Sequence, residues 1–235
     1  AGEIPESTLF HPHIDTGSGV CTSILVDRFL EGKFRLWAIA ASFGDNLHSS
    51  AHQLADSLKL DPKKIIELRE LVELINYNSY GETIDDLHFS PETLFLALQP
   101  FSEPFEFYRA SGELKQLRAG FRNDMLLAEE KLPLRKTTVG RIYQFPNAAW
   151  CRRVSGVFSN QVAREAPDLA HALLVERADS TFLVGVRAPI SKPQGAEKLC
   201  LKFSGGGRAA AAGINHLIPD DVDRFFDAFE KQFAN

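Results

Sequence analysis

The C-terminal part of the chain contains the segment Ser204-Gly205-Gly206-Gly207-Arg208-Ala209-Ala210-Ala211-Ala212-Gly213. Glycines allow positive φ angles and a close approach between the backbone and a ligand. Arginine adds planar, permanently charged donors that grip phosphate at two points. The alanine run predicts the start of a helix, whose first N–H groups lack partners and attract anions. The segment therefore predicts a phosphate-binding loop, although a tight turn before a helix packed against a sheet fits it equally well.

The residues around this segment predict a small sheet. Short runs rich in β-branched or aromatic residues follow Pro133 and are separated by turn residues, which is typical of strands. The expected strands are 137–145, 170–178, 181–187 and 197–203, with a hairpin turn at 178–180. An amphipathic helix is expected over 220–233. The C-terminal part is therefore predicted to be an α/β domain with a mixed sheet.

The N-terminal part is predicted to be mainly helical. Apolar residues recur at helical intervals in 21–30 and 62–74, and Ser90-Pro91 combines a capping serine with a proline at the first helical position. One long helix is expected over 112–131. The predicted fold class is therefore α/β, with a helical part joined by a long helix to the domain that carries the sheet.

Composition narrows the functional classes. The 235 residues carry a formal net charge of -5, which argues against binding long nucleic acids through a broad basic surface. A mononucleotide or a short oligonucleotide is compatible with this charge. The three cysteines are widely spaced and form no CxxC pair, and no apolar run is long enough to cross a bilayer. We therefore expect a cytoplasmic protein without a membrane partner.

The glycine segment resembles the Gly-Gly-Gly-His-x-x-Ala-Ala-Gly signature of the DHH-associated C-terminal domain, which occurs in DHH-family phosphoesterases such as the RecJ-like proteins. The match departs from the family at Arg208, where the family has a histidine. Val184-Gly185-Val186-Arg187 is similar to the family strand that ends in a phosphate-facing arginine, and 153–160 is similar to the segment that opens the domain. The resemblance implies that a substrate phosphate is bound by Arg187, by the glycine loop and by Arg208.

Two features of the first half extend this resemblance. The run 36–46 is similar to the apolar run of the family that ends in a metal-binding aspartate, which implies that Asp45 holds a metal ion. From the residues alone, Gly44-Asp45 places a carboxylate where a buried element ends, which suits a divalent cation but favours the end of a helix or strand before the cap of the next helix. Residues 1–13 look like the sequence that follows the Asp-His-His motif. The resemblance then implies that the chain begins after its catalytic signature.

The resemblance implies three ranges: 1–110 as the remainder of the DHH domain, 111–134 as a connecting helix, and 135–235 as the substrate-binding domain. It also implies a phosphoesterase that depends on Mn²⁺ or Mg²⁺ and acts on a nucleotide, a cyclic dinucleotide or a short single-stranded oligonucleotide. Its other partners would be the missing N-terminal half of the DHH domain and, in a homodimer, a second copy. Because a two-metal centre needs several ligands, we expect this chain alone to bind no metal and to be inactive. A non-catalytic module that binds nucleotide phosphate is the alternative.

The histidines leave more than one interpretation open. His216 follows the glycine segment, so substrate contact and simple surface exposure are both expected for it. His48 and His52 are four residues apart on a predicted helix, where they could face one ion, but no acidic partner completes that motif. His11 and His13 flank a proline and would project in the same direction. Supporting a metal, lining a cleft and an ordinary loop role all remain possible for these two.

Overall fold

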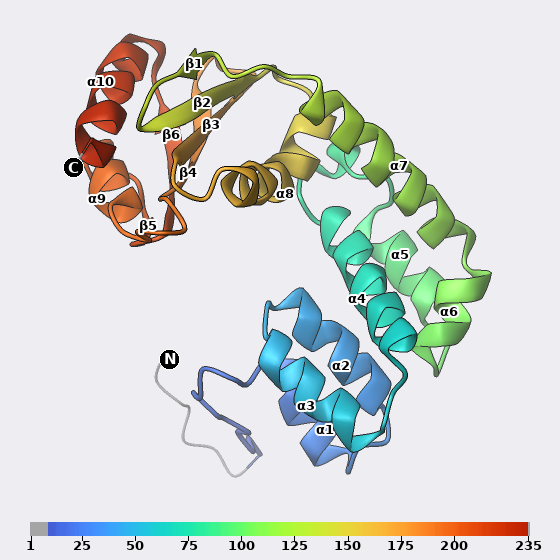
Figure 1. The fold of residues 1–235 in the computed structure, drawn as a ribbon. Helices are drawn as coiled ribbons and strands as arrows, with labels where there is room; N and C mark the ends of the chain where they lie inside the picture. Colours follow the sequence, from blue (N-terminus) through green and yellow to red (C-terminus); the bar gives the residue numbers. More distant parts are fainter. Residues whose placement is uncertain (1–8, 235) are drawn as a thin grey trace. The chain divides into compact units, whose positions relative to one another are not determined.

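The computed structural model describes residues 9–234, and it divides the chain into two compact units (Figure 1). The first unit comprises Ala1–Asn76 and Phe89–Arg118, and the second comprises Tyr77–His88 and Ala119–Asn235. The expected division into 1–110, 111–134 and 135–235 stays a prediction.

The first unit is helical throughout its regular structure. Its helices are α1 (Thr22–Phe29), α2 (Arg35–Gly44), α3 (His48–Ser57), α4 (Pro62–Tyr77), α5 (Pro91–Leu98), α6 (Pro104–Ala110) and the first part of α7 (Gly112–Glu129). Helix α5 begins as the sequence predicts, because the Thr93 backbone N–H donates to the Ser90 hydroxyl over 3.1 Å. The helices expected over 21–30, 62–74 and 112–131 are confirmed by α1, α4 and α7.

The second unit combines helices with a sheet that has six strands within the described residues. Its elements are the 3₁₀ turn η1 (Ile84–Asp86), β1 (Arg135–Lys136), β2 (Gly140–Phe145), α8 (Ala149–Glu165), β3 (Ala170–Glu176), β4 (Phe182–Arg187), α9 (Ala196–Leu201), β5 (Gly206–Arg208), β6 (Ala211–Leu217), η2 (Pro219–Asp221) and α10 (Val222–Phe233). The strand order is β1-β2-β3-β4-β6-β5, with β2 and β3 parallel and every other pair antiparallel. The predicted α/β fold class with a mixed sheet is confirmed.

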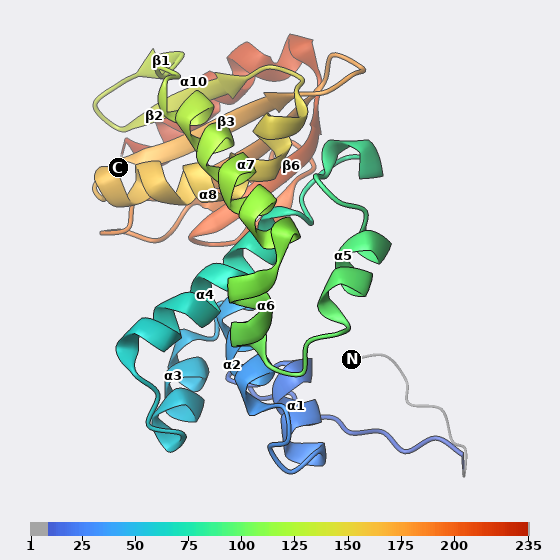
Figure 2. The ribbon, with the colours of Figure 1, turned by 90° about the vertical axis from the view of Figure 1, so that its right-hand side faces the viewer.

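The sheet is covered on both faces, as Figures 1 and 2 show for this unit. On one face, side chains such as Leu174, Val186 and Ile214 join α9 and α10 in the main core. Alternate residues along a strand point to opposite faces of the sheet, so the residues that alternate with these core residues along each strand point toward α8. There, the Phe158 ring lies 5.1 Å from Tyr143 and 5.0 Å from Phe145, between ring centroids. The face that α8 covers is the one that carries the candidate site.

Two predictions for this unit are wrong. Residues 197–203 were expected to form a strand but lie largely in helix α9. Ala196, Leu199, Cys200 and Phe203 are all buried, and this i, i+3, i+4, i+7 spacing is typical of a helix face. The alanine run at 209–212 was expected to begin a helix but forms the turn and first residues of the β5–β6 hairpin. Pairing of β6 between β4 and β5 overrides the helix propensity of alanine there.

Candidate phosphate-binding site

Arg187 and Arg208 lie in one transverse row of the sheet. Arg187 at the end of β4 is opposite Ala211 on β6, and Ala211 is in turn opposite Arg208 on β5. Directly opposed residues on neighbouring strands point to the same face, so both guanidinium groups extend from the face that α8 covers. Two strand spacings of about 4.8 Å place their backbones roughly 10 Å apart. The small alanine between them leaves the space above it to the two cations.

Neither arginine has an acidic partner among the described residues. The Nε of Arg187 donates to Asn160 Oδ1 over 2.8 Å, and its Nη1 donates to the Val186 carbonyl over 3.2 Å. Arg208 is exposed. Burial, followed by repulsion from the charge of Arg208, lowers the pKa of Arg187. An anion placed between them would remove that repulsion.

The glycine loop has a structural explanation for two of its three glycines. A Cβ on Gly205 would lie 2.3 Å from the Gly213 carbonyl oxygen, and Gly207 combines a φ of +146° with a Cβ position 2.6 Å from Ala212 Cα. Both glycines are therefore required by the close approach of β5 to β6. Gly206 has open space around its Cβ position and is exposed. The helix N-terminus expected to complete an anion cradle is absent here, because the alanine run is a hairpin, and phosphate contact by the glycines stays a prediction.

The same row continues across the sheet through residues that the sequence analysis did not select. His171 on β3 is opposite Arg187, and Arg141 on β2 is opposite His171. His171 is 1% exposed, and neither of its ring nitrogens makes a hydrogen bond within the described residues. Burial and then the charge of Arg141 lower the pKa of His171 to about 4, although the nearby Leu169 backbone opposes this. A neutral imidazole therefore lies between two guanidinium groups at neutral pH.

His216 is not brought together with the two arginines. It lies near the far end of β6, where its Nδ1 is 4.0 Å from Asp179 Oδ2 and its side chain is 58% exposed. His216 is five positions along the chain from Ala211, which corresponds to about 17 Å along a strand. Only a long ligand could therefore contact both Arg208 and His216, and it would do so through different groups.

Asp45 lies in the first unit, directly after helix α2, and is exposed. It lines a cavity of about 530 Å³ together with Ser23, Asp27 and Trp37, among others. In residues 9–234, no group of three or more His, Cys, Asp or Glu side chains is close enough together to hold a metal ion. The described residues therefore do not by themselves fit the expected Mn²⁺ or Mg²⁺ centre, and a metal at Asp45 stays a prediction.

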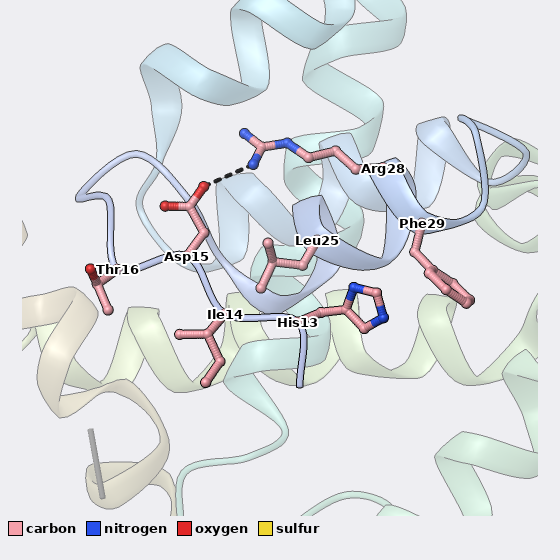
Figure 3. A pocket seen from close by; sticks show the side chains of 7 residues that line it. All are labelled: His13, Ile14, Asp15, Thr16, Leu25, Arg28 and Phe29. Carbon is pink, nitrogen blue, oxygen red and sulfur yellow. Dashed lines mark hydrogen bonds and ion pairs between the residues drawn. The ribbon is translucent and has the colours of Figure 1, made fainter. Parts of the chain in front are cut away.

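Residues 13–16, together with Leu25, Arg28 and Phe29, line a second cavity of the first unit, which has a volume of about 620 Å³ (Figure 3). Asp15 Oδ2 accepts a hydrogen bond from Arg28 Nη1 over 2.8 Å, and the His13 ring contacts Phe29 edge to face at 4.9 Å. The charges of Asp15 and Arg28 thus neutralise each other. Residues 1–13 were expected to match the sequence that follows the Asp-His-His motif, and residues 1–8 of that range lie outside the described residues.

His48 and His52, the two histidines that are four residues apart on helix α3, both pack against the Phe43 ring.

No family model matches the chain, and no curated protein matches it. Similar solved structures include PggH, a pGpG-specific phosphodiesterase from Vibrio cholerae, at 16% sequence identity and a TM-score of 0.49. They also include CDC45 from Entamoeba histolytica, at 12% identity and a TM-score of 0.44. Each likeness covers 72% of this chain but only 59% of the first structure and 38% of the second. The chain therefore spans less than two thirds of the length of either one.

Within the described residues, no helix is both long and apolar enough to span a membrane.

Proposed function

We propose that this chain binds the phosphate group of a nucleotide or short oligonucleotide between Arg187 and Arg208. The observation that carries the proposal is the shared register row, which sets two cations on one face of the sheet with only an alanine between them. Charge-assisted hydrogen bonds from arginine to phosphate are strong and often bidentate. The absence of an acidic partner for either arginine among residues 9–234 supports the same proposal.

We further propose that the chain belongs to a metal-dependent phosphoesterase of the DHH type. The resemblance of the Gly205–Gly213 segment to the signature of that family supports this, with Arg208 in place of the histidine. Asp45 would supply one carboxylate to a Mn²⁺ or Mg²⁺ centre, and the other ligands would come from a segment that carries the Asp-His-His motif of that family. When bound, such ions activate water and neutralise phosphate oxygens. The chain itself would contribute binding and orientation of the substrate.

A non-catalytic phosphate-binding module is the second candidate. It is favoured by the finding that no cluster of metal-binding side chains occurs within the described residues. In either case the three cysteines, which are all free, support a reducing compartment such as the cytoplasm.

The binding proposal is tested by calorimetric titration of the chain with ribose 5-phosphate, which carries a phosphate and no base. Arg208→Ala and Arg187→Met should each weaken binding about 10- to 150-fold, since a hydrogen bond to a charged group contributes about 1.5–3 kcal/mol. Arg122→Ala is the matched control, because Arg122 is an exposed arginine on α7 of the same unit. Unchanged affinity in both site variants would remove the two arginines from the site.

The enzymatic proposal needs a separate assay. Hydrolysis of bis(p-nitrophenyl) phosphate in the presence of Mn²⁺ is expected from a longer protein that includes the Asp-His-His region and not from this chain alone. Turnover by this chain, abolished by a chelator, would contradict the proposal that the metal ligands lie elsewhere. The absence of turnover in both would favour the non-catalytic module.

A further inference from the structure

A narrow cavity of about 180 Å³ lies between one side of helix α8 and strands β3 and β4. We refer to it as the α8 slot. Its helix side is formed by Ser155, Gly156 and Ser159, and its sheet side by residues that include Leu173, Leu183, Gly185 and Arg187. One end of the slot is therefore bounded by an arginine that also belongs to the candidate phosphate-binding site.

Two glycines leave the slot open where the helix and the sheet face each other. A Cβ on Gly156 would meet no atom within 4 Å, and a Cβ on Gly185 would meet only the Ser159 hydroxyl at 4.0 Å. Neither glycine has a positive φ angle. Alanine would therefore fit at both positions, and in a helix interior it would be more stable than glycine by about 1 kcal/mol. Backbone conformation and close packing thus explain neither glycine, whereas a need for open space explains both.

The chemistry of the slot walls is suited to a flat, mainly apolar ring with a polar edge. Leu173 and Leu183 supply apolar surface, and Leu183 is 37% exposed. Ser159 is only 5% exposed, yet its hydroxyl makes no hydrogen bond with other described residues. The Ser155 hydroxyl donates to the Arg152 carbonyl and keeps its lone pairs for an incoming donor. The Ser159 oxygen is not among the fully buried side-chain atoms that lack a partner, and Ser159 lines the slot, so its hydroxyl is open to a hydrogen bond with a ligand there.

The size of the slot limits the ligand to about one ring system. An apolar cavity of roughly 150 Å³ in another protein accepts benzene, so a cavity of about 180 Å³ accepts a single small heterocycle rather than a whole dinucleotide. The position of Arg187 limits the ligand further, because Arg187 both lines the slot and shares a register row with Arg208 on one face of the sheet. The occupant should therefore carry a phosphate close to its ring.

We propose that the α8 slot holds the base of a nucleotide whose phosphate is bound by Arg187 and Arg208. This inference rests on the proposed function and adds to it that recognition includes the base. The free Ser159 hydroxyl and the Ser155 oxygen would contact the hydrogen-bonding edge of the base, while Leu173 and Leu183 would contact its ring. The glycines at 156 and 185 provide the room that a base requires.

The test compares AMP, which carries a base, with ribose 5-phosphate, which does not, by calorimetric titration of the full chain. AMP should bind at least 10-fold more tightly than ribose 5-phosphate. Gly156→Leu should fill the slot and abolish this difference without changing the affinity for ribose 5-phosphate. Gly156→Ala is the matched control, because it raises helix propensity without filling the slot. In this variant the logarithm of the affinity ratio between AMP and ribose 5-phosphate should be at least half of its value in the parent chain. Ser159→Ala should weaken the binding of AMP several-fold and leave the affinity for ribose 5-phosphate unchanged.

The possible outcomes separate the two proposals. If ribose 5-phosphate binds through Arg208 but AMP binds no more tightly, the slot does not hold the base and the phosphate site stands. If AMP binds more tightly but Gly156→Leu changes nothing, the base is bound elsewhere, and the slot inference is again wrong. If neither ligand binds, the phosphate site itself is wrong. It is also wrong if Arg187→Met and Arg208→Ala both bind ribose 5-phosphate as tightly as the parent chain does. Unchanged affinity of Gly156→Leu for ribose 5-phosphate also verifies that this variant is folded.

Discussion

Replacing His171 should remove a specific part of the acid sensitivity of the second unit. The side chain is 1% exposed, and burial together with the charge of Arg141 lowers its pKa from 6.5 to about 4. In the unfolded chain the imidazole binds a proton near pH 6.5, whereas in the folded protein it does so only near pH 4. The unfolded state therefore gains protons first as the pH falls. Stability that is fully present above pH 6.5 is lost progressively as the pH falls toward 4.

The magnitude follows from the same two values. Each tenfold change in proton affinity corresponds to about 1.4 kcal/mol, so His171 should account for about 3 kcal/mol of the unfolding free energy lost between pH 7 and pH 4. His171→Leu should abolish this contribution. At pH 7 the same variant should have a stability within about 1 kcal/mol of the parent, because it replaces two unpartnered buried nitrogens with apolar atoms of similar volume.

The assay is urea unfolding followed by tryptophan fluorescence at pH 7 and pH 4. The chain has two tryptophans, and Trp37 belongs to the first unit. In a Trp37→Phe background, the signal comes from Trp150 on helix α8, which packs against Phe145 in the second unit. His216→Leu is the control, since that side chain is exposed, and it should retain the pH dependence of the parent. If His171→Leu loses as much stability between pH 7 and pH 4 as the parent does, the reasoning is refuted.

Two further predictions concern stability in each unit. Asp86→Asn should destabilise the second unit by about 3 kcal/mol, because it leaves the largely buried Arg152 without the carboxylate that now accepts two of its hydrogen bonds. Arg152 and two backbone N–H groups hold the pKa of Asp86 at about 2. The parent should therefore lose the stability that this ion pair contributes only as the pH falls from 3.8 toward 2. If Asp86→Asn loses the same unfolding free energy over that pH range, this reasoning is wrong. Ser90→Ala should cost about 1 kcal/mol in urea unfolding by loss of the cap on α5, and Ser90→Thr should recover most of it; no loss in Ser90→Ala would argue against the cap.

Local sequence was sufficient where the controlling interactions are close along the chain. The start of α5 was predictable because a serine and a proline determine it within four residues. The hairpin between β3 and β4 was predictable for the same reason, since the Ser180 backbone N–H donates to the Arg177 carbonyl and Ser180 adopts a φ of +64°. Arg208 was selected from the sequence by its charge and by the glycines beside it, whereas Arg187 was selected by the resemblance of 184–187 to a strand of the DHH-associated domain. Helix α9 could also have been predicted, because its apolar residues recur at helical intervals, but 197–203 was predicted to be a strand.

The tertiary structure decided what depends on pairing between distant segments. Ala209–Ala212 has the composition of a helix, yet β6 is held between β4 and β5, and the backbone hydrogen bonds gained there outweigh a propensity of less than 1 kcal/mol per residue. The row that joins Arg141, His171, Arg187 and Arg208 has no counterpart in sequence spacing, because a strand register is set by contacts across the sheet. Residue type and the family resemblance therefore identified the cations, whereas strand order and register decided that they share one face.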